Sequence, residues 1–356
     1  MRVALVGPPK SGKSTLFAAV AEAGGSHVDI SRPDQPHLAV VKVPDPRLDW
    51  LAQRYQPKRV THAELEFLDL PGLDLADEAG RTHARTHWAA MRQSDMLAFT
   101  VRGFANQSVP AYRNRIHPEG DLGELLAEML FADLDQVTVR AEKLTQALKK
   151  PTAHRGEQAQ ELELMKRLAA ALEADHPLSE MATSESESKL LRSFAFLSQK
   201  PSLAVLNGSE EDLKRPGPEK LAGLPCLQLS ARIEEEIAQL PPADRPEFLA
   251  DLGLEASARD RLIRACYRRM DLVSFFTVGQ EECRAWTVPA GTPALAAAGC
   301  VHTDMARGFI RAETVAFDDL HAAGDMKGAK AAGKVRLEGK TSIVRDGEVI
   351  LFRFNV

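Results

Sequence analysis

One stretch decides the fold of this chain: Gly7-Pro8-Pro9-Lys10-Ser11-Gly12-Lys13-Ser14-Thr15. It follows the apolar run 3–6, typical of a buried strand, and leads into residues 16–20, whose apolar spacing predicts a helix. Strand, GxxxxGK[ST] and helix in this order form the context of a Walker A loop, whose backbone N–H groups surround phosphates at the positive end of the helix. We therefore predict phosphate binding over residues 7–15, with Lys13 on the β- and γ-phosphates and Ser14 on Mg²⁺.

Length, composition and charge bound the function. The chain has 356 residues, of which 44% are hydrophobic and 27% charged, and its net charge is −5. This length predicts two or three domains, and the composition is ordinary for a soluble globular protein. The negative charge excludes a polycation that coats nucleic acid, so an RNA contact requires a local basic patch, and we expect no DNA partner.

The cysteines and the apolar runs indicate the compartment. The four cysteines, Cys226, Cys266, Cys283 and Cys300, form no CxxC pair and no ligand cluster, which suits reduced thiols better than disulfides. The chain enters its first strand at once, leaving no room for a signal peptide, and no apolar run approaches the length of a membrane span. We expect a cytoplasmic protein without a membrane partner.

Two further motifs lie at the ends of expected strands. Asp69-Leu70-Pro71-Gly72 is a DxxG motif, a weak signal alone because turns use the same residue types. At this distance from a Walker A loop it predicts that Asp69 holds Mg²⁺ through water and that Gly72 faces the γ-phosphate. The strands 202–207 and 226–229 end in Asn207-Gly208-Ser209-Glu210 and Ser230-Ala231, where a GTPase-like fold reads its base.

The remaining segments predict the domain organisation. Apolar residues recur at spacings of three and four on both sides of a polar turn at 149–156, which predicts a helical hairpin inserted into an α/β domain. The basic tip of this hairpin could touch an anionic partner or be solvated. From Phe275 onward, short β-rich runs and a helix at 319–323 predict a separate α+β domain. We expect a P-loop domain over 1–118 and 198–273, the insertion over 119–197 and the last domain over 274–356.

Together these residues resemble one family, the YchF/Obg-like ATPases of the translation-factor GTPase class. Beyond the motifs above, the resemblance rests on residues 43–48, 285–289, 302–304, 308–312 and 354–356, and it runs in order along essentially the whole chain. It implies an α/β fold: a G domain with a mostly parallel sheet, an inserted helical hairpin and a C-terminal TGS domain of β-grasp shape. It also implies an ATP-binding, slowly hydrolysing switch that uses Mg²⁺, binds ATP and ADP, and acts on the ribosome or RNA.

The base preference depends on residues 207–210. A GTPase of the NKxD type uses an aspartate to accept hydrogens from guanine, and adenine offers neither of them. This chain has neither that lysine nor that aspartate, and its NxxE spelling resembles the family pattern that goes with ATP. We expect Asn207 to serve adenine through its amide, with backbone groups of Gly208 and Ser209 supplementing it. Phe104 either packs beside the adenine or is an ordinary core aromatic.

The catalytic group is less evident than the binding loop. Ras-type enzymes place a water-orienting glutamine after DxxG, where this chain has Leu73, so hydrolysis must be slow or use another group. The resemblance implies a histidine in the loop after the strand that ends near Phe104. The register falls near Ala111, which leaves His117 as the candidate in that loop, unless it is a surface residue.

The switch segments and Lys10 also depart from the family pattern. The threonine that completes the Mg²⁺ shell is replaced by Pro33, with Ser31 the nearest hydroxyl. In place of a Gly-rich switch II, residues 78–87 present arginines and histidines (Arg81, Arg85 and His83) that either meet a phosphate or RNA backbone or form a solvated helix face. Lys10 stands where related GTPases have an asparagine that coordinates K⁺, so its ammonium could replace that ion or point to solvent. These changes indicate a divergent paralogue.

Two other function classes stay open at this point. The loop spelling also suits a small-molecule P-loop kinase, although no Arg-rich lid is evident and the motifs follow the GTPase order. A scaffold that binds nucleotide only for structure is the other alternative. Single-turnover hydrolysis by the pure protein separates the scaffold from the ATPase.

Overall fold

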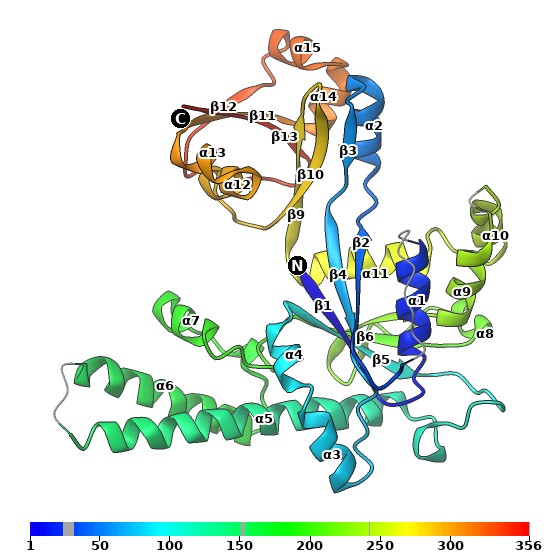
Figure 1. Ribbon diagram of the computed structural model, residues 1–356, viewed down its shortest axis with the longest axis vertical. Helices are drawn as coiled ribbons and strands as arrows, with labels where there is room; N and C mark the ends of the chain where they lie inside the picture. The colour runs from blue at the N-terminus through cyan, green and yellow to red at the C-terminus, as the bar shows by residue number, and fades with distance from the viewer. Residues whose placement is uncertain (24–31, 151–153, 242, 356) are drawn as a thin grey trace. The chain divides into compact units, whose positions relative to one another are not determined.

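The computed structural model describes residues 1–23, 32–150, 154–241 and 243–355 (Figure 1). The chain divides into two compact units, one formed by Met1–Ala39 and Glu66–Arg259 and the other by Val40–Leu65 and the chain from Asp260 onward. Among the described residues, no helix combines the length and the apolar character needed to cross a membrane. The four cysteines are free thiols.

The first unit is built on a seven-stranded sheet with the order β2-β4-β1-β5-β6-β8-β7. Its strands are β1 (Arg2–Val6), β2 (His37–Lys42), β4 (Glu64–Asp69), β5 (Met96–Arg102), β6 (Ser202–Asn207), β7 (Lys220–Leu221) and β8 (Leu224–Leu229). The pairs β1–β4, β1–β5, β5–β6 and β6–β8 are parallel, and β7 is antiparallel to β8. The predicted parallel α/β sheet is confirmed, and because its central strands are buried on both faces they read as continuous apolar runs.

Helices cover this sheet. They are α1 (Lys13–Ala23), α3 (Glu78–Arg85), α4 (Trp88–Gln93), α8 (Glu210–Leu213), α9 (Ala231–Gln239) and α10 (Arg245–Asp251), with a short 3₁₀ turn η1 (Tyr112–Asn114). Helix α11 (Ala258–Arg269) begins at the end of this unit and lies mostly in the second. Helix α1 packs against α9. A core cluster joins β5 to α3, α4 and the first turns of α5 through Phe99, Ala84, Met91, Leu122 and Leu125. This cluster ties the segment after Gly72 to the sheet.

The predicted helical hairpin is confirmed. Helices α5 (Pro118–Ala147) and α6 (Arg155–Glu173) lie side by side (Figure 1), followed by η2 (Leu178–Glu180) and α7 (Glu185–Arg192). Their apolar stripes form a separate core that includes Val137, Leu144, Met165 and Leu168. The described basic residues of the tip, Lys149, Lys150, His154 and Arg155, are exposed.

One buried carboxylate anchors the hairpin to the chain that returns to the sheet. Asp133 of α5 is 0% exposed. It accepts hydrogen bonds from the backbone N–H groups of Leu197 (3.0 Å) and Ser198 (2.7 Å) and from the Ser198 hydroxyl (2.8 Å). The Arg92 guanidinium of α4 donates to the same carboxylate at 3.0 Å. Because burying a charge is costly unless it is paired and hydrogen-bonded, these four donors make Asp133 a fixed junction.

The second unit carries a six-stranded mixed sheet with the order β12-β11-β13-β9-β10-β3. Its strands are β3 (Arg59–Thr61), β9 (Leu272–Val278), β10 (Glu282–Pro289), β11 (Phe309–Ala316), β12 (Arg336–Glu338) and β13 (Glu348–Phe354), and its helices include α12 (Ala294–Val301), α13 (Thr303–Arg307), α14 (Phe317–Ala323) and α15 (Met326–Ala331). β9 and β10 form an antiparallel hairpin, and β13 is parallel to β9. The predicted α+β domain after Phe275 is confirmed.

Residues 40–65 and 260–273, which we expected in the P-loop domain, group with this second unit. Helix α2 (Pro46–Tyr55) packs on β9 and β10, and β3 pairs with β10. Asp45 caps α2 by accepting from the Arg47 N–H (3.0 Å), and the Arg47 side chain donates to Asp45 (2.8 Å) and Asp346 (2.7 Å). These carboxylates raise the pKa of the Arg47 guanidinium. The segment 43–48 is therefore a joint within the C-terminal unit, and the exact domain boundaries stay a prediction.

Candidate functional site

The glycine-rich loop lies at the carboxyl end of β1, where parallel strands deliver their following residues to one edge of the sheet. Residues 8–15 line a cavity of about 390 Å³ together with Pro33 and Gly72. Gly12 has φ +84°, and a Cβ there would lie 2.1 Å from the Asn207 amide nitrogen. A Cβ on Gly72 would lie 2.9 Å from Pro9 Cα. Both glycines are required because backbone and side chain approach too closely for any other residue.

The two charged groups predicted to bind phosphate and metal are paired with each other. The Lys13 ammonium donates to the Asp69 carboxylate and to the Leu70 carbonyl, and both charged side chains are buried. Burial lowers the pKa of the Lys13 ammonium, and the Asp69 carboxylate opposes that effect. The site therefore holds its own neutralising pair in this structure.

The residues present fit a Mg²⁺ ion that comes with a nucleotide. Ser14 lies in the first turn of α1 and lines the cavity, and Asp69 ends β4 beside Lys13. Mg²⁺ is commonly held by one or two protein oxygens, substrate phosphates and water. In the described ranges no group of three or more His, Cys, Asp or Glu side chains could hold a metal alone. Pro33 lines the cavity as the register predicts, and Ser31 lies outside the described residues.

Asn207 braces the site. It is 3% exposed, its Nδ2 donates to the Ser11 carbonyl (2.9 Å) and its Oδ1 accepts from the Ala231 N–H (2.9 Å). The amide therefore joins the phosphate loop to the start of α9, next to the buried Ser230. These bonds leave one Nδ2 hydrogen and one Oδ1 lone pair for a ligand, and the role of this amide in binding adenine stays a prediction.

The backbone after Asn207 is also engaged. The Gly208 N–H donates to the Leu229 carbonyl (2.8 Å), and the Ser209 N–H donates to Asp212 (2.8 Å) in a capping box that starts α8. The backbone supplement expected from Gly208 and Ser209 would therefore have to come from carbonyl groups, and it stays a prediction. Glu210, the first residue of α8, is largely exposed and lies 3.7 Å from the Lys214 ammonium.

Phe104 lies close to the loop. A Cβ on Gly12 would be 3.8 Å from the Phe104 ring. The Arg102 guanidinium lies over the Phe104 ring, 4.4 Å from the ring centroid, and it donates a hydrogen bond to the Phe104 carbonyl at 3.0 Å. The ring is half-buried, so it is placed beside the loop and is not an ordinary core aromatic.

His117 does not reach the loop cavity. It is exposed and immediately precedes α5. Its neighbours Ile116 and Pro118 line a different cavity of about 290 Å³ that also borders Gly208 and Asp212. His117 is therefore not among the residues that line the cavity at residues 8–15, and its role as the catalytic histidine stays a prediction.

The arginines of the altered switch II segment meet carboxylates. Arg81 pairs with Glu128 of α5, and Arg85 lies 3.8 Å from Glu128 and 3.7 Å from Glu78. Glu128 is buried, and such a carboxylate needs a cation. The two arginines therefore lie beside carboxylates of the protein, and contact with a phosphate or an RNA backbone stays a prediction.

His87 was missed by the sequence reasoning. It lies between α3 and α4, and its Nε2 is buried without a hydrogen-bond partner among the described residues. Its ring meets that of His83 edge-on, with centroids 5.3 Å apart. Burial lowers the pKa of His87, and the nearby charges of His83 and Lys13 lower it further. The i, i+4 spacing of the two histidines was the signal available in the sequence.

Comparisons with known proteins agree along the whole chain. Residues 2–132 match the family described as 50S ribosome-binding GTPase, and residues 272–355 match the YchF-GTPase C-terminal family, described as a protein of unknown function (DUF933). The ribosome-binding ATPase YchF of Bacillus subtilis is 36% identical, covering 99% of this chain and 98% of that protein. The Obg-like ATPase 1 of Oryza sativa subsp. japonica is 32% identical, over 100% and 92%. The solved YchF GTPase of Schizosaccharomyces pombe is similar with a TM-score of 0.84 at 25% identity, over 99% and 97%.

Proposed function

The chain belongs to the YchF family, and we propose that it is an ATP-binding, slowly hydrolysing switch whose nucleotide state controls its binding to the ribosome. The observation that carries this proposal is the cavity of about 390 Å³, lined by residues 8–15 together with Gly72. Its loop, its buried lysine and its DxxG aspartate are the parts that phosphoryl transfer to water requires.

The hydrogen bonds around Asn207 support adenine over guanine. Guanine presents O6 as an acceptor and needs a donor there, whereas the 6-amino group of adenine needs an acceptor. The N–H groups of Gly208, Ser209 and Ala231 are all engaged within the protein. The carbonyls of Gly208 and Ser209 remain, and leaving a buried polar group of the wrong base unpaired costs about 1–3 kcal/mol.

The phosphates are proposed to separate Lys13 from Asp69. A bound nucleotide would offer the Lys13 ammonium its β- and γ-phosphates. This would free the Asp69 carboxylate to hold Mg²⁺ through water, and Ser14 would supply the protein oxygen on the ion. Mg²⁺, when bound, neutralises charge on the phosphates. Gly72, which lies against Pro9 of the loop, directs its backbone to the γ-phosphate.

Slow hydrolysis follows from the residue after Gly72. Leu73 is buried in the core, and its N–H donates to the Gly7 carbonyl at 2.9 Å. It therefore cannot orient water as a glutamine does. Lys10 lines the cavity with φ +61°, and we propose that its ammonium supplies fixed positive charge to the phosphates in place of K⁺.

The ribosome is the proposed partner, and the names of the relatives support it. The B. subtilis relative is a ribosome-binding ATPase, and the family matched over residues 2–132 is described as a 50S ribosome-binding GTPase. We assign the mixed sheet after residue 272 as the TGS domain and the compartment as the cytoplasm.

Three measurements test this function. Titration with ATP, ADP, GTP and GDP in the presence of Mg²⁺ is expected to give tighter binding of the adenine nucleotides, and tighter binding of GTP would refute the base assignment. Single-turnover mixing is expected to convert ATP slowly to ADP and phosphate, which a scaffold would not do. The ATP-loaded protein is expected to co-sediment with 70S ribosomes at low salt.

A further inference from the structure

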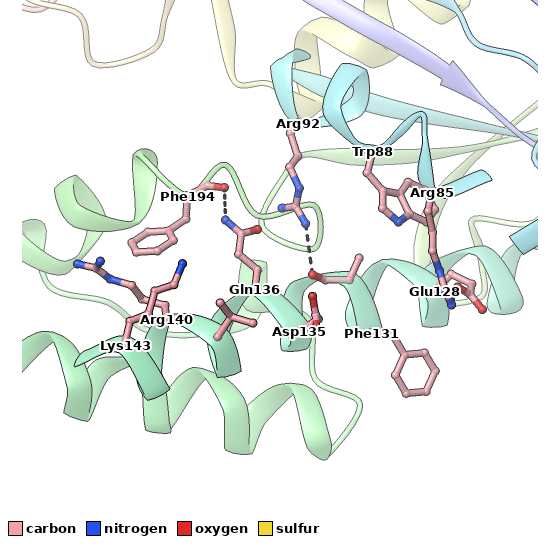
Figure 2. A pocket seen from close by; sticks show the side chains of 12 residues that line it. Arg85, Trp88, Arg92, Glu128, Phe131, Asp135, Gln136, Arg140, Lys143 and Phe194 are labelled. Atoms are coloured by element: carbon pink, nitrogen blue, oxygen red, sulfur yellow. Dashed lines mark hydrogen bonds and ion pairs between the residues drawn. The ribbon is translucent and has the colours of Figure 1, made fainter. Parts of the chain in front are cut away.

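A groove of about 740 Å³ lies in the first unit between the α3–α4 segment and α5 (Figure 2). One wall carries Arg85, Trp88 and Arg92 from the chain that follows Gly72. The other wall is the side of α5 that faces away from the core of the hairpin. This groove is distinct from the nucleotide cavity, and it shares no lining residue with it.

The α5 wall presents a regular stripe. Phe131, Asp135, Val139 and Lys143 are spaced four residues apart, so they form one i±4 ridge that runs obliquely along the helix over about 18 Å. Phe131 is 63% exposed and Val139 is 40% exposed. Figure 2 shows the Phe131 ring projecting outward from α5. The stripe therefore offers two exposed apolar side chains to a partner.

The charges of the groove are mostly satisfied within the protein. Arg92 is bonded to Asp133 (3.0 Å), Arg140 to Glu161 (2.7 Å), and Arg85 lies 3.8 Å from Glu128. Lys143 and Asp135 are different. Within the described part of the chain neither has a hydrogen bond or an ion pair, and they lie eight residues apart on the same stripe.

This pattern decides the class of occupant. A nucleic acid would need several free cations along its backbone, and the groove leaves Lys143 as the cation without a partner among its described lining residues. An amphipathic helix docks through apolar side chains at helical spacing, and an i±4 row of side chains forms a ridge against which a second helix can pack. The stripe offers an apolar side chain before and after Asp135, and Lys143 one turn beyond Val139.

We propose that this groove docks an amphipathic α-helix of a ribosomal protein, with apolar side chains on Phe131 and Val139, a basic residue facing Asp135 and an acidic residue facing Lys143. The inference rests on the proposed ribosome binding and names the partner surface for it. The opposite wall belongs to the α3–α4 segment that follows Gly72, which connects the groove to the nucleotide site along the chain.

Co-sedimentation with 70S ribosomes tests the surface with a matched pair of variants in the full-length, ATP-loaded protein. Phe131→Glu places a charge in the stripe, and Thr138→Glu places the same charge on an exposed residue of α5 outside the groove lining. We expect at least tenfold weaker binding for Phe131→Glu, unchanged binding for Thr138→Glu, and unchanged ATP binding and thermal unfolding for both. Equal ribosome binding by the two variants would overturn the groove while leaving the proposed function intact.

Photo-crosslinking identifies the occupant. With p-benzoylphenylalanine in place of Val139, the expected product on irradiation with 70S ribosomes is an adduct to a ribosomal protein, lost when Phe131→Glu is added. An adduct to ribosomal RNA, or no adduct from protein that co-sediments, would overturn the inference. Failure of the unmodified protein to co-sediment would instead remove the proposed function, and the groove proposal with it.

Discussion

Replacing Asn207 by alanine should destabilise the first unit even when no nucleotide is bound. The change removes both bonds of the buried amide, to the Ser11 carbonyl and from the Ala231 N–H. Ser11 and Ala231 are themselves buried, so both backbone groups lose a partner that water does not replace. Each unsatisfied buried group costs about 1–3 kcal/mol, so the two groups together give a loss of about 2–6 kcal/mol. For a unit of this size that corresponds to a melting temperature roughly 4–24 °C lower.

Urea unfolding of the nucleotide-free protein measures this loss. The chain has three tryptophans, and Trp88 belongs to the first unit whereas Trp50 and Trp286 belong to the second. A background with Trp50→Phe and Trp286→Phe makes the fluorescence of Trp88 report the unit that contains Asn207. The midpoint should fall without a change in slope, because the surface exposed on unfolding is the same.

Glu210→Ala is the matched control from the same motif. Its side chain is largely exposed and its ion pair with Lys214 spans 3.7 Å, so its removal should change the free energy of unfolding by less than about 0.5 kcal/mol. A loss below about 1 kcal/mol for Asn207→Ala, accompanied by a loss of ATP affinity, would show that Asn207 reads the base and does not brace the loop.

Three further predictions concern the hairpin, the histidine and the loop. Asp133→Asn should lower the free energy of unfolding by about 3 kcal/mol because it breaks a buried charge pair, whereas Asp135→Asn on the exposed side of the same helix should be neutral; similar midpoints in urea would contradict this. Burial lowers the pKa of His87, so the unfolded chain binds more protons and stability falls as the pH drops from about 7 to about 5.5; His87→Phe should flatten that fall in melting temperature, and an unchanged slope would refute it. Hydrolysis should be equal in K⁺ and Na⁺ and become K⁺-sensitive or be lost in Lys10→Asn, and stimulation of the unmodified protein by K⁺ would remove the role proposed for Lys10.

Local patterns sufficed to predict the elements of this fold. The strand, loop and helix around residues 2–23 follow from composition alone, because an apolar run, a glycine-rich turn and helix formers each have a local physical cause. The same holds for α5 and α6, whose apolar residues recur with the helical period. The parallel order of the sheet follows from motifs that must meet at one edge.

Long-range pairings could not be predicted in the same way. Asn207 lies 196 residues from Ser11 in the sequence. An asparagine at this position matches the base-reading motif whether or not its side chain also bonds to the loop. The Walker A motif assigns Lys13 to a phosphate, and the DxxG motif assigns Asp69 to a metal ion. Neither motif therefore predicts that the two side chains pair with each other. Residues 40–65 join the C-terminal unit through β3 and α2, and nothing in their local spacing indicates which sheet they complete.

With the phosphate and metal roles proposed above, the pairing of Lys13 with Asp69 should make the site selective for an anion and a metal that bind together. Free phosphate would take the ammonium and leave the buried carboxylate without a cation, and a divalent metal alone would meet the lysine instead of a free ligand. Only a ligand that brings anion and metal in one step satisfies both groups. The ion pair should therefore disfavour binding of phosphate alone and of metal alone, and favour binding of the complex between them.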